Sequence, residues 1–492
     1  MKKNILFTTI LLLSSSVIFD VTASAPMATS QAPVITVSGQ ASFNARWFHN
    51  KNQKVRNDSN LGQNFAANAT TNQVINEQNF QVFTPLPLNL STVEGYGRGY
   101  MFTMDDTSLK FALDGTTDYD MDYGAVIIVN GDTEQVSGEL TTYDKTIKES
   151  YVWAGGTYGR IITGDTDGVE SMMAFGGADP LGGTGGFDGT FDRALNPVTG
   201  TITTVDLVGS TGKATKITYQ TPRFYGLQAG VTFTPQNNHL GEAKANTSRD
   251  YGSDVVLGPV DRRNIAGAIN FQNEFENGLQ LNASLTGIFA KTQPEFTGAQ
   301  WFLTDVNGVI VSQGSGNQKN TASYAIGGGL SYKDFEFGIE FGDNGKSHEI
   351  KDLAAKTKGV HKNAGWFINT GVAYTYGPTK VSFGYMYAKR NGLGLNGTVQ
   401  NNNVNYFKAK NRTNIFTFSV DQKLSAGAGI YFEYAHYDMK NEGFNVDAML
   451  INSLNSVLSN GNLFTASGGG LAGPVGPKQK MDAFTLGTKV KF

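Results

Sequence analysis

Cysteine is absent from all 492 residues, so the chain can form no disulfide, no thiolate metal site and no cysteine nucleophile. The net charge of −3 is too small to indicate nucleic acid as a partner. The five histidines show no HExxH or other paired spacing, and the sequence GxSxG does not occur. We therefore predict no catalytic residue, no metal site, no cofactor and no enzymatic activity.

Long apolar runs are also missing after the N-terminal segment, which excludes a bundle of membrane-spanning helices. Only 39% of the residues are hydrophobic, whereas glycine (60), phenylalanine (32) and tyrosine (20) are frequent. Strands with one apolar and one polar face give such a moderate average, because only every second residue needs to be apolar. The composition is therefore compatible with a sheet that spans a membrane.

The first residues have the order of a secretory signal peptide. Positive charge at Lys2 and Lys3 precedes an apolar run over residues 5–19, and small residues follow at 23–25. An N-terminal membrane anchor is the alternative, but the run is short and polar residues interrupt it. We predict export, with residues 1–25 as the signal peptide and cleavage at the small residues or a few positions later.

The C-terminal segment 482–492 alternates between two faces. Phe484, Leu486 and Val490 share one parity, whereas Lys489 and Lys491 fall on the other. About ten residues of tilted strand cross a hydrocarbon layer, and the segment has this length. We expect the apolar side chains to face lipid and both lysines to face the periplasmic mouth. The segment should pair with the strand predicted at 37–48, because a spanning sheet cannot leave edges open.

The same alternation recurs along the chain in about sixteen segments, with uncertain boundaries. Short turns alternate strictly with long loops, and the turns fall near Thr116, Pro222, Asn277, Asp334, Gly377 and Lys423. Short turns at one end and long loops at the other are typical of transmembrane barrels. The predicted fold is all-β: residues 26–492 form one transmembrane antiparallel β-barrel of about sixteen strands.

Three motifs and the last residue carry a family resemblance. The motifs are KFALDGT at 110–116, YVWAGG at 151–156 with its continuation to Gly164, and KITYQTPRFYGL at 216–227. Together with the terminal Phe492 they resemble the general porins of Gram-negative outer membranes. The resemblance implies a homotrimer of sixteen-stranded barrels in the outer membrane, each with its own pore. It also implies that Phe492 is an assembly signal.

Residues 165–212 stand where the third loop of these porins folds into the barrel as a constriction. The segment is rich in glycine and in carboxylates, and the predicted acidic pore residues are Asp165, Asp167, Glu170, Asp179, Asp188 and Asp192. An ordinary acidic loop on the outer surface is the alternative. The close carboxylates at 165–170 lack the full calcium-loop pattern.

The opposite wall should supply the counter-charge. By parity, five basic residues face the lumen: Arg46, Lys110, Lys148, Arg160 and Lys216. Facing acidic and basic arrays create a transverse field in a pore. The alternative is that each is a rim charge near a strand end. The family often has another basic residue where Ile162 stands and one near Asp165. This chain has neither, so its basic array is thinner and strong anion selectivity is not expected; we therefore predict a weak cation preference.

The predicted function is passive diffusion of small hydrophilic solutes and ions through a water-filled pore. Lipid and lipopolysaccharide of the outer membrane are expected partners, the latter bridged to the long loops through divalent ions. Two alternatives remain open. A substrate-specific porin, for instance for sugars, would need a lumenal track of aromatic residues, and a surface adhesin or antigen would use the barrel only as an anchor.

Overall fold

The computed structural model of the chain describes residues 17–20, 33–51, 98–117, 119–131, 147–189, 202, 205–237, 260–293, 300–304, 310–315, 318–349, 364–396, 405–441 and 479–492. Its main feature is a closed antiparallel barrel, because every strand from β2 to β10 and from β13 to β19 has a partner on both sides. These sixteen strands confirm the predicted fold.

The barrel strands of the first half are β2 (Val34–Lys51), β3 (Arg98–Thr116), β4 (Asp122–Asn130), β5 (Ile147–Gly156), β6 (Gly159–Asp165), β7 (Thr215–Gln220), β8 (Leu227–Gln236), β9 (Val260–Glu274) and β10 (Leu279–Gln293). Those of the second half are β13 (Thr321–Tyr332), β14 (Phe335–Asp343), β15 (Trp366–Tyr376), β16 (Thr379–Asn396), β17 (Asn405–Lys423), β18 (Ala428–Asn441) and β19 (Gln479–Lys491). Each strand pairs with its neighbour in sequence, and β19 closes the ring on β2.

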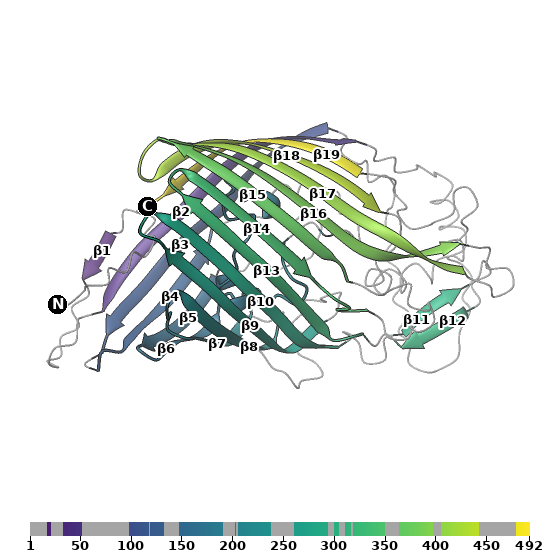
Figure 1. Cartoon of the computed structure of the whole chain (residues 1–492), viewed down its shortest axis with the longest axis horizontal. Coiled ribbons are helices and arrows are strands. Elements are labelled where there is room, and N and C mark those ends of the chain that lie inside the picture. Colours follow the sequence, from purple (N-terminus) through teal and green to yellow (C-terminus); the bar gives the residue numbers. More distant parts are fainter. Residues whose placement is uncertain are drawn as a thin grey trace, which may run out of the picture.

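The connections divide between the two ends of the barrel (Figure 1). Short turns lie at one end, at residues 117–121, 157–158, 221–226, 275–278, 333–334, 377–378 and 424–427. The longer connections all lie at the other end. This segregation was predicted, and it sets the orientation in a membrane, because short turns belong to the periplasmic side of outer-membrane barrels.

The C-terminal strand closes the barrel by pairing with the predicted strand. Phe484 of β19 is paired with Trp47 of β2, and Val490 is paired with Ala41. The apolar parity points outward, since Phe484 is 44% exposed and Val490 is 50% exposed. The prediction for Lys489 is wrong: its ammonium group donates to the carbonyl oxygen of Gly183 inside the barrel instead of facing the periplasmic mouth.

Aromatic side chains form a belt on the outer surface toward the long connections. Ring pairs link neighbouring strands, with centroid distances of 5.3 Å for Trp366 and Tyr387, 4.7 Å for Tyr385 and Phe416, and 4.9 Å for Tyr434 and Phe484. Amphipathic rings prefer the boundary between hydrocarbon and headgroups. The belt therefore marks one edge of the apolar band.

A few elements lie outside the ring. β1 (Val17–Asp20), within the predicted signal peptide, pairs with the first residues of β2, while β11 (Gln300–Thr304) and β12 (Ile310–Ser315) form a separate hairpin. α2 (Val169–Met172) and the 3₁₀ turn η1 (Gly186–Asp188) follow β6. Within the described ranges, no helix has the length and apolar character needed to cross a membrane.

Candidate constriction inside the barrel

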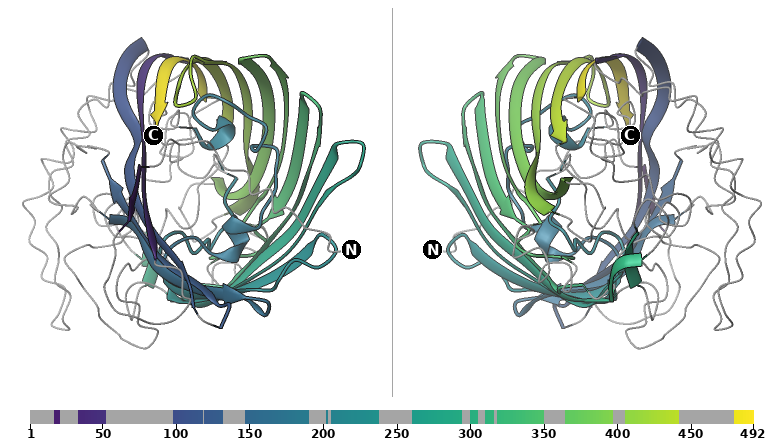
Figure 2. Two further views of the ribbon diagram at one scale, coloured as in Figure 1. Left: turned by 90° about the vertical axis from the view of Figure 1, so that its left-hand side faces the viewer. Right: turned by 90° about the vertical axis from the view of Figure 1, so that its right-hand side faces the viewer.

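The connection from β6 to β7, residues 166–214, enters the barrel; it is called the inward loop here. Its described parts, 166–189, 202 and 205–214, include α2 and η1, and Figure 2 shows both turns inside the ring of strands. This arrangement agrees with the predicted constriction loop and not with an outer-surface loop. The loop passes along the inner wall from β8 toward β19.

The inward loop is fastened to the wall mainly through its own backbone. Its N–H groups donate to one polar side chain on each of several strands: Val169 to Thr232 (3.0 Å), Phe175 to Ser284 (2.9 Å), Gly177 to Asn369 (2.8 Å), Gly182 to Ser382 (2.9 Å) and Thr184 to Glu433 (2.9 Å). Buried backbone groups of a loop need such partners, because water does not reach them. The polar inward parity of the strands supplies them.

Glycines in the wall let the loop approach. Gly329, Gly338, Gly371 and Gly384 stand in direct register across β13, β14, β15 and β16. A β carbon at Gly338 or Gly371 would lie less than 3.0 Å from a carbonyl oxygen of the inward loop. Glycine in a strand interior often marks such a close approach. The sequence prediction considered only the glycines of the loop, although the wall glycines were visible in the sequence.

Apolar contacts add to the fastening. Val169, Met173 and Phe187 of the inward loop are at most 2% exposed and pack with small or aliphatic wall residues such as Ala268 and Ile288. Burial of a large apolar side chain contributes roughly 1.5–3 kcal/mol. Three such anchors hold α2 and η1 against the wall.

Two of the predicted pore charges are instead buried at the base of the loop. Lys216 is 2% exposed and donates to the carbonyl oxygens of Thr166 and Gly212, the latter at 2.5 Å. Glu170 is 6% exposed and accepts from the backbone N–H of Thr211 at 2.9 Å. These contacts join the departing and returning arms of the loop. Neither side chain faces open lumen.

A further ion cluster reinforces this base. Lys213 bridges Asp167 of the loop and Glu149 of β5, with 2.7 Å between its ammonium nitrogen and a Glu149 oxygen. Burial lowers the pKa of Lys213, but the hydrogen bonds and charges of Asp167 and Glu149 outweigh this, so the pKa lies above its usual value. Glu149 was not among the predicted site residues, because the parity prediction placed its neighbour Lys148 inward; the register of β5 against β4 shifts between Glu149 and Ile147, so that Lys148 has no directly paired residue in β4.

The remaining predicted acidic residues lie in different places. Asp179 is exposed and accepts from the backbone N–H of Gly176 at 2.9 Å. The crowded wall removes enough water to raise the pKa of Asp179, against the effect of that hydrogen bond. Asp165 is the last residue of β6. It has the same parity as Ile161, whose side chain faces outward, and its carboxylate accepts a hydrogen bond from the Thr215 hydroxyl group. Asp188 belongs to η1, and Asp192 lies outside the described residues.

The predicted basic residues also differ in their surroundings. Lys110 is exposed on the inward parity of β3, and Lys148 is half-buried on β5. Arg46 is fully buried, and its Nε donates to Thr485 at 3.1 Å. Arg160 follows the turn at 157–158 and stacks on Trp153 at 3.9 Å. The five residues therefore do not form one continuous basic array.

Wall carboxylates behind the inward loop were missed by sequence reasoning. Asp421 accepts from the N–H of Gly183 at 3.0 Å, and Asn369 donates to Glu340 at 2.8 Å. Glu433 is 1% exposed and accepts from both the N–H and the hydroxyl of Thr184. Asp421 and Glu433 are thus bonded to the inward loop, whereas Glu340 is bonded to Asn369, which itself accepts from the loop.

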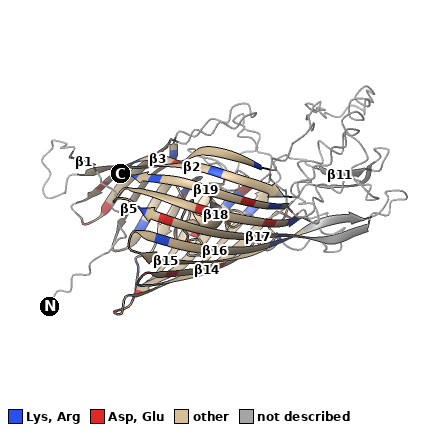
Figure 3. Cartoon of the chain, turned by 90° about the horizontal axis from the view of Figure 1, so that it is seen from above, with Lys and Arg blue, Asp and Glu red and all other residues tan. Residues whose placement is uncertain are grey.

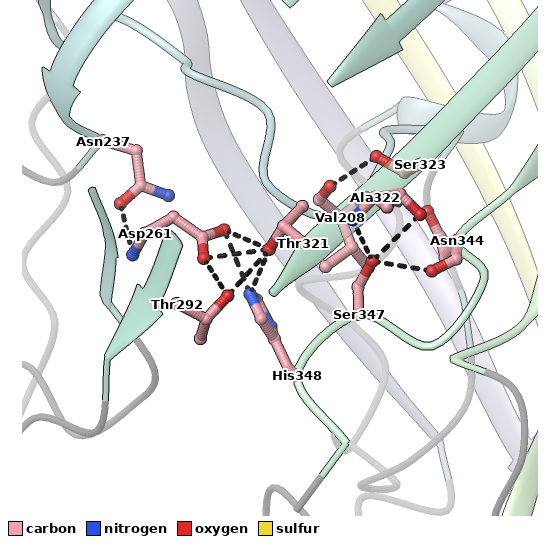
Figure 4. A network of polar contacts seen from close by, with 10 residues as sticks. All are labelled: Val208, Asn237, Asp261, Thr292, Thr321, Ala322, Ser323, Asn344, Ser347 and His348. Atoms are coloured by element: carbon pink, nitrogen blue, oxygen red, sulfur yellow. Dashed lines mark hydrogen bonds and ion pairs between the residues drawn. The ribbon is translucent and has the colours of Figure 1, made fainter. Parts of the chain in front are cut away.

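A polar network joins the inward loop to the wall near the long connections (Figure 4). His348 Nε2 lies 3.0 Å from both the Asp261 carboxylate and the Thr321 hydroxyl, and Thr292 donates to Asp261 at 2.6 Å. A hydrolytic triad uses the two ring nitrogens for the two contacts. Here the Nε2 atom of His348 makes both contacts, and this geometry is that of a structural network. Among the described residues, no cluster of three or more metal-ligating side chains occurs.

The comparisons with known proteins extend over most of the chain. The sequence profile described as Gram-negative porin matches residues 14–442. An uncharacterized protein of Rickettsia typhi is 24% identical over 379 residues, covering 68% of this chain and 78% of the relative. An uncharacterized protein of Rickettsia felis is 23% identical over 331 residues, covering 59% and 70%.

Two solved structures are also similar. An anion-selective porin from Comamonas acidovorans has a TM-score of 0.47 at 14% identity, with 94% of this chain and 100% of that chain covered. The trimer form of OmpT from Vibrio cholerae has a TM-score of 0.48 at 9% identity, with the same coverage. Since the family profile covers far more than half of the sequence, the chain belongs to the Gram-negative porin family, whose members lie in the outer membrane.

Proposed function

We propose that this porin lets small hydrophilic solutes and ions diffuse passively through the barrel, with a weak preference for cations. The observation that carries the proposal is the solvent exposure of two charged residues on β3. Lys110 and Asp114 share the inward parity, and both side chains remain exposed although they point into the barrel. Charged groups inside a barrel stay exposed where water fills the lumen. The inward loop packs on the opposite wall.

The cation preference rests on a smaller set of acids than the sequence suggested. Among the inward-loop carboxylates whose side chains the structure describes, Asp179 and Asp206 are exposed, whereas Glu170 is buried and Asp167 is paired with Lys213. Lys110, exposed on the inward parity of β3, adds a fixed positive charge to the lumen and keeps the preference weak. Fixed charge beside a narrow passage concentrates counter-ions there.

The proposal includes assembly and export. We infer a homotrimer, lipopolysaccharide as a partner and removal of residues 1–25 as a signal peptide; the family membership and the order of residues at the N-terminus support these inferences. The channel function requires no chemical step, and the structural geometry of the His348 network agrees with this.

Planar-bilayer recording with the purified full-length mature chain tests the function. We expect stepwise increases in conductance. In a salt gradient, the sign of the reversal potential should indicate a preference for cations over anions. A clear anion preference would refute the selectivity. Barrels that are folded and inserted, yet electrically silent, would refute diffusion and favour a surface anchor.

A further inference from the structure

Two opposite charges inside the barrel, Arg160 of β6 and Asp114 of β3, do not neutralise each other by direct contact. Both side chains have the inward parity of their strands and lie near the short turns, an end of the barrel where acidic and basic positions both occur (Figure 3). The Nε atom of Arg160 is buried without a hydrogen-bond partner. Within the described ranges, no ion pair joins either residue to an opposite charge. Both charges are therefore available to a solute.

The indole ring of Trp153 fixes the position of the guanidinium. The ring lies over Gly124 of β4, because a β carbon at Gly124 would come within 2.5 Å of the Trp153 Nε1 atom. The guanidinium carbon of Arg160 is 3.9 Å from the ring centroid. This cation–π contact orders the planar group before a solute arrives. An ordered guanidinium loses less entropy when it binds a carboxylate.

The strand register sets the separation of the two charges. Gly124 is directly paired with Asp114 on one side and with Trp153 on the other. Neighbouring strands are about 4.8 Å apart, so the guanidinium above the indole lies within roughly 10 Å of the Asp114 carboxylate. The two charges attract each other across this gap. An α-amino acid with a charge-assisted hydrogen bond at each end spans roughly 8 Å, which is long enough to bridge them.

A second acid makes the site unfavourable for a simple anion. Asp122 of β4 is exposed, accepts from the Thr116 hydroxyl at 2.9 Å and is linked to Arg160 by direct pairing through Gly155. A solute with only a carboxylate would be repelled by two aspartates, and a solute with only an ammonium group would be repelled by Arg160. Such repulsion against the wrong solute gives specificity. A zwitterion satisfies charges of both signs.

Apolar surface lies beside the arginine. Gln220 of β7 is directly paired with Arg160, and its amide nitrogen is 3.6 Å from the sulfur of Met172 in α2. The Met172 side chain is exposed, although it belongs to the inward loop. Methionine adapts to apolar groups of different shapes. It offers a contact to the side chain of a bound amino acid.

We propose that Arg160 and Asp114 form a lumenal subsite for zwitterionic α-amino acids. Arg160 binds the carboxylate, Asp114 binds the ammonium group, and Met172 contacts an apolar side chain. The subsite deepens the proposed function by naming a class of solute, and it rests on the water-filled lumen proposed there. Weak binding inside a pore raises the local concentration of a solute and still permits its release.

Ligand-observed NMR titration of the detergent-solubilised full-length mature chain tests the subsite. The probes share one apolar body and differ in charge: L-leucine is a zwitterion, N-acetyl-L-leucine carries only the carboxylate, and L-leucinamide carries only the ammonium group. We expect L-leucine to bind at least roughly threefold more tightly than either derivative. Equal binding of the three probes by the wild-type chain, or tighter binding of a derivative, would overturn the proposal.

Single-charge variants assign the two partners. Arg160→Gln should remove the preference for L-leucine over L-leucinamide, and Asp114→Asn should reduce the preference for L-leucine over N-acetyl-L-leucine. The matched control, Glu336→Gln with Lys380→Gln, removes one acid and one base of the inner wall that are already paired at 3.0 Å. It should leave all three dissociation constants unchanged. Wild-type preferences in both subsite variants would also overturn the proposal.

Planar-bilayer recording keeps the two proposals separate. Wild-type channels that conduct ions while the three probes bind equally would overturn the subsite and leave diffusion intact. Folded barrels that prefer L-leucine yet stay electrically silent would overturn diffusion alone.

Discussion

The ring of Phe492 lies over Gly39, so that a β carbon at Gly39 would come within 2.5 Å of the Phe492 Cζ atom. The same two residues exchange backbone hydrogen bonds of 2.9 and 3.0 Å, the last ones between the closing strand and β2. An aromatic ring over a strand glycine shields the exposed backbone and fixes the register. The last residue therefore locks the seam of the barrel.

Deletion of Phe492 should impair assembly more than Phe492→Ala does. The deletion removes the ring and the hydrogen bonds to Gly39, whereas the alanine variant removes only the ring. The folded fraction in unheated gel electrophoresis measures the effect, with Phe383→Ala on the outer face as the control. Unit conductance of the channels that do form should stay normal. A full yield of folded trimer from the deletion would contradict this role.

Gly371→Ala should displace the inward loop. The new methyl group would meet the carbonyl oxygen of Gly177 at less than 3.0 Å, and backbone cannot yield as a flexible side chain does. Overpacking of this kind costs about 1–3 kcal/mol. We expect a lower thermal unfolding temperature and an altered unit conductance. Gly267→Ala is the matched control, because nothing lies within 4 Å of its added carbon.

Lys213→Met should destabilise the loop in a pH-dependent way. The pKa of Lys213 is raised in the folded state, so its contribution is complete below the unfolded lysine pKa of about 10.4 and is lost as pH rises through the folded pKa. The difference in unfolding temperature between wild type and variant should be constant from pH 7 to 9. It should shrink above pH ~10.5. A difference in unfolding temperature that stays constant up to pH ~12 would refute a stabilising role for the charge of Lys213.

Asp179→Asn should weaken the cation preference. Its carboxylate is exposed, whereas that of Glu170 is buried and bonded to Thr211, so Glu170→Gln should leave selectivity nearly unchanged. Because the pKa of Asp179 is raised, the wild-type preference should begin to fall at a higher pH than for an ordinary aspartate. Reversal potentials from pH 7 to 4 measure both effects. Equal ion selectivity of the wild type and the Asp179→Asn variant at pH 7 would refute the role of Asp179 in cation preference.

The barrel could be predicted from the sequence because its signal is local and repeated. Alternation such as that of Phe484, Leu486 and Val490 needs no knowledge of distant residues, and short turns between such segments give the pairing order. The seam between 482–492 and 37–48 followed from the need to close the sheet. Each of these conclusions depends on a physical rule that acts along the chain.

The constriction could be predicted only in outline. Parity indicates that Lys216 and Lys489 point inward, but it cannot tell whether an inward residue meets water or another segment. Both lysines donate to carbonyl oxygens of the inward loop, and Glu170 is buried against Thr211. Contacts between segments far apart in sequence decided which charges remain in the lumen. Single-sequence patterns do not contain that information.

The fastening of the inward loop has a consequence for how the family can diversify. Its contacts with the wall use the peptide N–H groups of residues such as Val169, Phe175 and Gly177, which every amino acid except proline possesses. Side chains that point away from the wall can therefore be exchanged without detaching the loop. Selection for a new nutrient or against a toxic solute can act on such positions while the scaffold stays folded.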